Sequence, residues 1–213
     1  MRGDNMYLDC NIVKEGAPSL NEKCEKVRLP LSEDELTCIK SLYEYMIVSE
    51  NDELTKKYGI RPGVGIAAPQ VGVNKRMFAM NATDFLDEKR KKYMYALINP
   101  QIIGHTEEMT YLPDGEGCLS VTRNTEGLVT PRYYGIKAKA ILFDYATEKC
   151  KNVTMELYGY PAIVFQHEYD HLDGILYTSK MYKVDELPVK ALPLYTVEDD
   201  EIEDGNDEED DNK

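Results

Sequence analysis

The sequence predicts an α+β fold in which antiparallel or mixed β-sheets pack around a central helix that binds a metal ion, with an amphipathic helix nearer the amino terminus. Three observations support this class. An early stretch has the apolar spacing of a helix, the middle of the chain is rich in β-branched and aromatic residues, and a second helical stretch follows. Because helices and strands do not alternate regularly, a parallel α/β sheet is not expected.

The first predicted helix covers residues 33–49. Ser32 and Glu35 stand at the spacing of a capping box, in which each residue satisfies a free backbone N–H at the start of a helix. Apolar residues then recur on one helical face, at Leu36, Ile39, Tyr43, Met46 and Ile47.

The middle of the chain predicts four strands, and a second helix follows them. The strands are expected at 75–82, 93–104, 133–145 and 151–159, the last two joined as a hairpin by ATEK. The helix is expected to begin near Pro161, which suits a first helical turn, and to end at Gly174, which suits a carboxyl-terminal cap.

Charge and composition indicate one acidic intracellular domain over 1–197. The net charge is −14, but eleven acidic residues and one lysine fall in 198–213, so this tail carries −10 and the rest about −4. The tail has almost no apolar residues and is predicted to be disordered. No dense basic patch suggests nucleic acid, no apolar run approaches the roughly 20 residues that span a bilayer, and no secretion signal is evident, so a cytoplasmic location is expected.

Residues 165–174, FQHEYDHLDG, place two histidines four positions apart. On a helix, His167 and His171 would share one face, where their imidazoles can bind a metal ion. A zinc peptidase and a pair of hydrogen-bonded structural histidines both agree with these residues alone.

A third ligand decides what kind of metal site this is. The longer peptidase pattern H-x-x-G-x-x-H is incomplete, because Tyr177 stands at its last histidine position, and the remaining histidine, His105, lies in a polar stretch. Cys118 in DGEGCLSV is the better candidate. Thiolate and imidazole both suit transition metals, and three protein ligands leave one position open for water.

The segment GVGIAAPQVG, residues 63–72, also needs an interpretation. It fits the dinucleotide pattern G-x-G-x-x-A, but Pro62 replaces the expected apolar strand and Pro69 interrupts the phosphate-binding helix. We interpret it as an extended segment with exposed backbone groups, in which the Gln70 amide can donate to a developing oxyanion.

Together, three motifs resemble those of the peptide deformylases. They are GVGIAAPQ at 63–70, EGCLS at 116–120 and QHEYDH at 166–171, and the resemblance extends over about residues 12–185. The interval of about 45 residues between the first two motifs is similar to that of a longer-insertion, type II-like subclass common in Gram-positive and related bacteria.

The resemblance implies a metal-dependent hydrolase that removes the formyl group from the initiator methionine of nascent bacterial polypeptides. It implies one divalent ion, Fe(II) physiologically, with Ni, Co or Zn able to replace it. The implied ligands are Cys118, His167 and His171. Glu168 would move protons between the attacking water and the departing amine, while Gln70 and the Leu119 backbone N–H would hold the oxyanion. The alternative is an HExxH-type metallopeptidase that cleaves unformylated peptides.

The expected partners are N-formylmethionyl peptides and nascent chains, bound to a monomer. The peptide is expected to pair as an added strand with the backbone around Val64 and Gly65. The other predicted substrate-binding residues are Glu116, Gly117 and, for the methionine side chain, Tyr160, Ile163 and Val164. Transient ribosome association stays open, because the acidic tail departs from the basic helix with which some family members dock.

Overall fold

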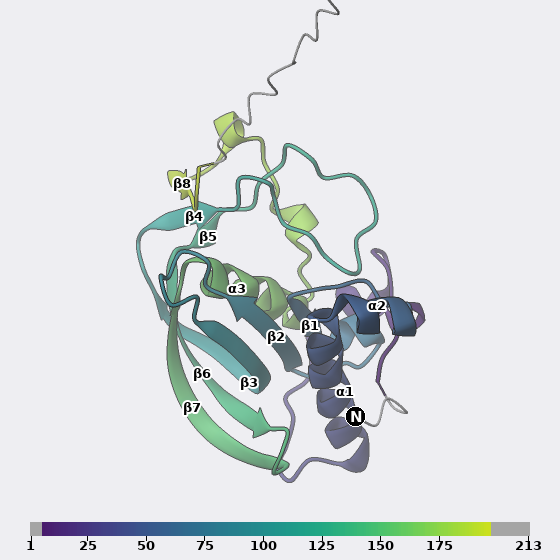
Figure 1. The fold of residues 1–213 in the computed structure, drawn as a ribbon. Helices are drawn as coiled ribbons and strands as arrows, with labels where there is room; N and C mark the ends of the chain where they lie inside the picture. The colour runs from purple at the N-terminus through teal and green to yellow at the C-terminus, as the bar shows by residue number, and fades with distance from the viewer. Residues whose placement is uncertain (1–5, 197–213) are drawn as a thin grey trace, which may run out of the picture.

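The computed structural model describes residues 6–196, which form an α+β fold with α3 at its centre (Figure 1). The α-helices are α1 (Glu33–Ser49), α2 (Asp52–Tyr58) and α3 (Gly159–Leu172). The strands are β1 (Gly65–Ala67), β2 (Met77–Thr83), β3 (Lys92–His105), β4 (Met109–Tyr111), β5 (Arg132–Tyr133), β6 (Gly135–Asp144), β7 (Lys149–Tyr158) and β8 (Ala191–Pro193). The predicted fold class is confirmed.

The strands form two sheets. The larger has the order β1-β2-β3-β6-β7, and each neighbouring pair is antiparallel. The smaller has the order β5-β4-β8, with β4 antiparallel to β5 and parallel to β8. In Figure 1, α3 lies between the larger sheet and the smaller one. The smaller sheet therefore stands beside the central helix, where it can support the loops around it.

Strand β2 is buried on both faces and separates two apolar clusters. Successive side chains of a strand point to opposite faces, and here Met77 and Ala79 pack in the cluster that contains α1. Phe78 and Met80 pack in the cluster that contains α3, where Phe78 meets Phe165 edge to face at 5.2 Å between ring centroids. This packing fixes α3 against the sheet.

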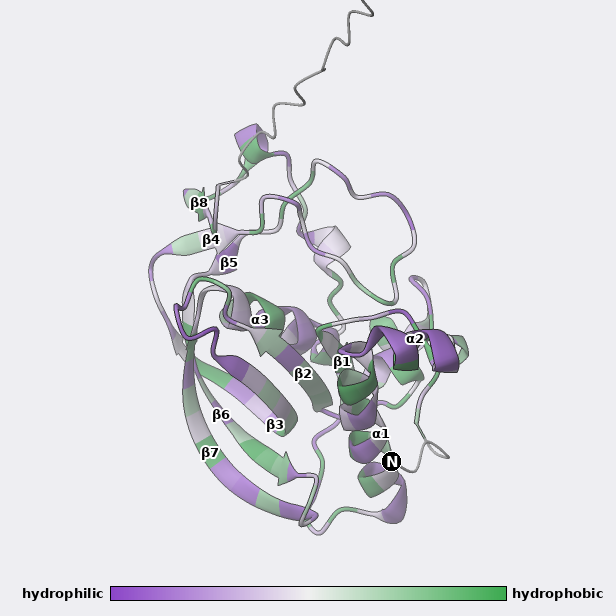
Figure 2. Cartoon of the chain, viewed as in Figure 1, coloured by the Kyte–Doolittle hydropathy of each residue, from purple (hydrophilic) through white to green (hydrophobic). Residues whose placement is uncertain are grey.

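Helix α1 has the bounds that its sequence predicts. Ser32 Oγ accepts a hydrogen bond from Glu35 N at 3.2 Å, and Ser32 N donates to Glu35 Oε2 at 3.0 Å, which completes the capping box. Along α1 hydrophobic and hydrophilic residues alternate around the axis, whereas the exposed α2 is mostly hydrophilic (Figure 2). The helical prediction for 33–49 is confirmed.

Helix α3 begins two residues earlier than predicted and ends as predicted. Gly159 has φ +57° and donates its N–H to Tyr134 O at 2.8 Å, so the chain turns at Gly159 and Pro161 lies in the first turn. At the other end, Gly174 has φ +71°, with its N–H donating to His171 O at 3.2 Å and Ile175 N–H donating to Asp170 O at 3.0 Å. These are the two bonds of a Schellman cap.

The four predicted strands are present with small shifts at their ends. They correspond to β2, β3, β6 and β7, and β6 and β7 form the predicted hairpin. The start of the predicted strand 133–145 divides between β5 and β6. The sequence prediction missed α2, β4 and β8, and it named β1 only as an extended segment.

Two predictions concern residues that the structure does not describe. The domain boundary at 197 and the disorder of 198–213 lie outside residues 6–196 and remain predictions. Within the described range, no helix combines the length and the apolar character needed to cross a membrane.

Candidate active site

Three segments that are distant in sequence meet at one cavity. Helix α3 contributes His167, the loop after β4 contributes Cys118, and the short 3-10 helix Ala68–Val71 after β1 contributes Gln70, while His171 is buried one turn further along α3. The cavity has a volume of about 510 Å³. Its lining includes every predicted substrate-binding residue, namely Val64, Gly65, Glu116, Gly117, Tyr160, Ile163 and Val164.

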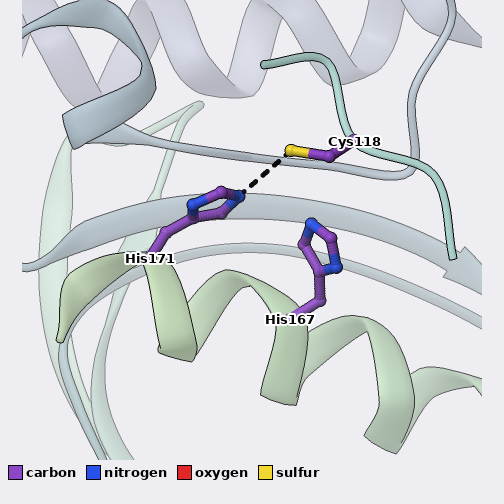
Figure 3. Close-up of side chains that lie close together, drawn as sticks. All are labelled: Cys118, His167 and His171. Carbon is purple, nitrogen blue, oxygen red and sulfur yellow. Dashed lines mark hydrogen bonds between the residues drawn. The ribbon is translucent and has the colours of Figure 1, made fainter. Parts of the chain in front are cut away.

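The side chains of Cys118, His167 and His171 face one another (Figure 3). Their ligand atoms all lie within 4.8 Å of one another, and Cys118 Sγ is 3.4 Å from His171 Nε2. Metal bonds of about 2.0–2.3 Å in a tetrahedron would separate sulfur and nitrogen ligands by roughly 3.5 Å. One thiolate and two imidazoles in this arrangement fit a divalent transition metal, and a fourth position can stay open.

A buried carboxylate orients His167. Glu116 Oε2 lies 2.7 Å from His167 Nδ1, which leaves Nε2 as the nitrogen that can face a metal ion. Arg132 donates to both oxygens of Glu116, at 2.7 and 2.9 Å. Burial alone would raise the pKa of Glu116, but the charge and hydrogen bonds of Arg132 and the bond to His167 lower that pKa to about 2. An ionised carboxylate behind a ligating histidine fixes its tautomer and ring orientation.

Arg132 also connects the Glu116 carboxylate to Asp170 of α3. Arg132 Nη1 also donates to Asp170 Oδ2, and Lys180 Nζ lies 2.9 and 3.0 Å from the two Asp170 oxygens. The prediction made Glu116 a substrate-binding residue. Its position on the cavity wall agrees with that, but both oxygens are engaged by protein groups, so we assign it a positioning role toward His167. The signal that sequence reasoning missed is Arg132, a buried basic residue in β5.

The two histidines differ in their electrostatic environment. Burial, then the charge of His167, lowers the pKa of His171 well below its usual value, so its imidazole is neutral. Burial alone would also lower the pKa of His167, but hydrogen bonds to Cys118 and Glu116 raise it well above its usual value. Any proton on the metal-facing nitrogen of His167 would have to leave before that nitrogen could bind a metal ion.

Glu168 is buried in the cavity wall, with a side-chain oxygen that has no partner within the described range. The residue is 3% exposed, and Oε2 makes no hydrogen bond to the described residues. Burial raises the pKa of Glu168 to about 7. A carboxyl group that is not committed to structure and titrates near neutrality is suited to proton transfer.

Gly65 makes room for Glu168. A Cβ built on Gly65 would lie 2.2 Å from Glu168 Oε1, much closer than side chains approach. The sequence predicted Gly65 as a backbone partner for substrate, and its place in an edge strand agrees with that. The structure adds a second reason for glycine here, since any side chain would displace the buried carboxylate.

Gln70 and Leu119 lie beside the three proposed ligands. Gln70 Oε1 accepts from Ala67 N at 2.8 Å, which turns Nε2 toward Ser120 Oγ at 3.2 Å and Cys118 Sγ at 3.4 Å. The Leu119 carbonyl accepts from Lys14 Nζ at 3.2 Å and from Arg61. Hydrogen bonds hold both groups at the cavity.

The remaining candidate ligands lie elsewhere or cannot serve. His105 is exposed and stacks on Tyr133 at 3.7 Å, away from the cavity. Tyr177, at the last histidine position of the peptidase pattern, packs against the His167 ring at 5.5 Å between centroids. Sequence reasoning missed several lining residues, among them Leu112, Arg61 and Arg123.

Comparisons with known proteins agree on one family. A family model described as polypeptide deformylase matches residues 10–186. The peptide deformylase of Halalkalibacterium halodurans is 46% identical over 171 residues, covering 80% of this chain and 89% of the relative. Peptide deformylase 2 of Geobacillus stearothermophilus is 44% identical over 186 residues, covering 86% and 96%.

Solved structures agree as well. A class I type b peptide deformylase from Acinetobacter baumannii superposes with a TM-score of 0.62 at 25% identity, covering 82% of this chain and 99% of the other. The peptide deformylase of Thermotoga maritima gives a TM-score of 0.58 at 31% identity, covering 82% and 97%.

Proposed function

The chain belongs to the polypeptide deformylase family, and we propose from this premise how its own residues perform the family's reaction. It is a metal-dependent hydrolase that removes the N-formyl group from the initiator N-formylmethionine of nascent bacterial polypeptides and releases formate. One observation carries the assignment of roles: Cys118, His167 and His171 converge on one another, and Cys118 and His167 share the cavity wall with a buried carboxyl group, Glu168. The metallopeptidase alternative is not favoured.

We propose that Cys118, His167 and His171 hold one divalent ion, Fe(II) in the cell, with Ni, Co or Zn able to replace it. A thiolate and two imidazoles suit all four metals. When bound, the ion supplies a Lewis acid that polarises the formyl carbonyl and makes hydroxide available near neutral pH. Metal analysis of protein purified without oxygen tests the choice of ion.

Glu168 is the proposed proton carrier. Its carboxylate takes a proton from the attacking water and delivers it to the amine nitrogen as the C–N bond breaks. The burial that raises its pKa to about 7 supports this role, since a group titrating near the working pH both accepts and returns a proton. Glu168 Oε2, which has no hydrogen-bond partner among residues 6–196, supports it as well.

Gln70 and Leu119 are the proposed donors to the oxyanion. The Gln70 amide nitrogen already lies 3.4 Å from Cys118 Sγ, beside the proposed metal position. The carbonyl of Leu119 is held by Lys14 and Arg61, which fixes the orientation of the loop that carries its backbone N–H. Donors held in place before the reaction stabilise charge without the cost of reorganisation.

The peptide is proposed to extend β1. This strand is at the edge of the larger sheet, and Val64 beside it is exposed. An edge strand offers free backbone groups to an added strand. The methionine side chain is assigned to the apolar wall formed by Tyr160, Ile163 and Val164, and Gly117 lies on the same cavity wall as the peptide path.

A cytoplasmic location follows from the proposed substrate, because nascent chains carry their formyl group there. The monomeric state and a transient ribosome association stay predictions. Light scattering of the purified protein and co-sedimentation with ribosomes would test them.

Two blocked peptides test the reaction. Formyl-Met-Ala-Ser and acetyl-Met-Ala-Ser differ by one methyl group, and rates are divided by the hydroxide-catalysed rates of the same compounds. Loss of fit for one methyl discriminates by about 10–200-fold, and misplacement of the carbonyl adds to this, so we expect a corrected preference above about 10²-fold for formyl. We expect formate as product and an intact Met-Ala bond. Equal corrected rates for the two peptides, or cleavage of the internal Met-Ala bond, would favour the metallopeptidase alternative.

A further inference from the structure

The segment 191–196 packs behind the apolar end of the cavity, and the family match ends before it, at residue 186. Two lining residues, Leu112 and Tyr160, stand at this end. Leu112 directly follows β4, and Tyr160 lies at the start of α3. Both are held from behind by residues near the end of the described chain.

Strand β8 fixes the strand that leads into Leu112. Its parallel pairing with β4 aligns Thr110 with Leu192, and Thr110 Oγ1 donates to Leu192 O at 2.9 Å. Leu194 N donates to Tyr111 O at 2.9 Å, one residue before Leu112. Displacement of β8 would therefore move the wall at Leu112.

Tyr195 supports the same wall by a second route. Its hydroxyl donates to Asp114 Oδ2 at 2.7 Å, within the loop that continues to Cys118. Its ring meets the Phe85 ring edge to face at 5.5 Å between centroids, and Phe85 meets the Tyr160 ring at 5.1 Å. The contacts run in series from Tyr195 through Phe85 to the cavity wall.

Residue Leu194 closes the space between these contacts. It is 8% exposed, and a Cβ built on Gly159 would lie 3.6 Å from its Cδ1. Gly159 immediately precedes Tyr160. The segment 191–196 therefore supports both the backbone before Tyr160, through Leu194, and the Tyr160 ring, through Tyr195 and Phe85.

We infer that Tyr195 and Phe85 are positioning residues that set the depth of the pocket for the first side chain of the substrate. The inference rests on the proposed function for the identity of that side chain. Neither residue lines the cavity itself, and both act through the Tyr160 ring. Removal of either ring lets Tyr160 move outward, so the pocket loses its fit to methionine and gains room for a larger side chain.

The test compares formyl-Met-Ala-Ser with formyl-Phe-Ala-Ser for wild type and Tyr195→Ala. Tyr195→Ala should raise KM for the methionine substrate severalfold, leave kcat within about twofold, and raise the phenylalanine-to-methionine ratio of kcat/KM by about tenfold, the effect of one misfitted methylene. Metal content should not change. Tyr195→Phe loses the hydroxyl bond to Asp114 but keeps the ring that contacts Phe85, so it should keep the wild-type ratio because the ring contacts set the pocket depth.

A matched control and a second variant separate selectivity from folding. Tyr145 makes the same kinds of contact far from the cavity, with its hydroxyl on Glu44 and its ring stacked on Tyr43 at 5.0 Å, so Tyr145→Ala should leave the ratio unchanged. Phe85→Ala removes the ring that lies between Tyr195 and Tyr160. Because Phe85 is exposed in a loop, this variant should fold and reproduce the changed ratio even if Tyr195→Ala does not fold.

The outcomes are distinct. If wild type releases no formate from formyl-Met-Ala-Ser, the proposed function fails and the inference falls with it. If wild type is active and folded Phe85→Ala keeps the wild-type KM and ratio, the inference alone is wrong.

Discussion

Replacement of Gly65 by alanine tests how closely the reaction depends on the position of Glu168. The added Cβ would lie 2.2 Å from Glu168 Oε1, whereas ordinary contact begins at 3.4 Å. The carboxylate must therefore move by about 1.2 Å, or β1 must shift by as much. A displacement near 1 Å can cost about 10²-fold in rate, which equals roughly 2.7 kcal/mol of transition-state stabilisation. Gly65→Ala should thus lower kcat/KM for formyl-Met-Ala-Ser about 100-fold and keep its metal.

A double-mutant comparison shows whether the loss passes through Glu168. Glu168→Gln alone should keep the metal and lose about 10²–10⁴-fold in rate. If Gly65→Ala acts by displacing this carboxylate, it should cost little more in the Glu168→Gln background. Gly104→Ala is the control, because its Cβ would meet nothing closer than Lys137 Cβ at 3.8 Å. The reasoning that Gly65→Ala acts by displacing Glu168 would be refuted by either of two results. One is a double variant whose loss of rate is the product of the two single losses, and the other is a Gly65→Ala enzyme with near-wild-type kcat/KM.

Three further predictions concern the metal ligands, their support and the tail. Cys118→Ala should lose bound metal and activity while Cys150→Ala, a free cysteine outside the cavity, keeps both, and full metal occupancy in Cys118→Ala would exclude Cys118 as a ligand. Glu116→Gln should weaken metal affinity by about 10–100-fold, because His167 loses its charged partner. Competition with a chelator measures this affinity, and a wild-type affinity would contradict the positioning role of Glu116. A chain ending near Val197 should fold and deformylate a short peptide normally, and a large change in kcat/KM would show that the tail reaches the active site.

Local signals predicted the elements that local interactions stabilise. The capping box at Ser32 and the apolar spacing after it predict α1 because both act within a few residues. The β6–β7 hairpin follows from two β-rich stretches with a short connection. Helix α2 carries the same kind of signals, an Asn51 cap and a left-handed Gly59, but its seven residues show little apolar periodicity and the prediction missed it.

Elements defined by distant partners could not be predicted in the same way. Strands β4 and β8 have three residues each, and their parallel pairing joins Thr110 to Leu192, 82 positions apart. The role of Glu116 depends on Arg132, in a two-residue strand. The proposed ligands could be predicted from the sequence because only a few residue types bind a transition metal. The contacts that support them can be made by many residue types at many positions, so the sequence does not single them out.

The two edges of the larger sheet differ in a way that bears on product release. The outer edge, β7, has ten residues and carries exposed Lys149, Lys151 and Glu156, charges that discourage another strand from pairing there. The other edge, β1, has three residues and ends at the 3-10 helix that contains Pro69. A paired peptide can gain only a few main-chain hydrogen bonds, each worth about 0.5–1.5 kcal/mol net. Such weak, sequence-independent attachment would let the deformylated chain leave quickly, which suits an enzyme that meets each new polypeptide once.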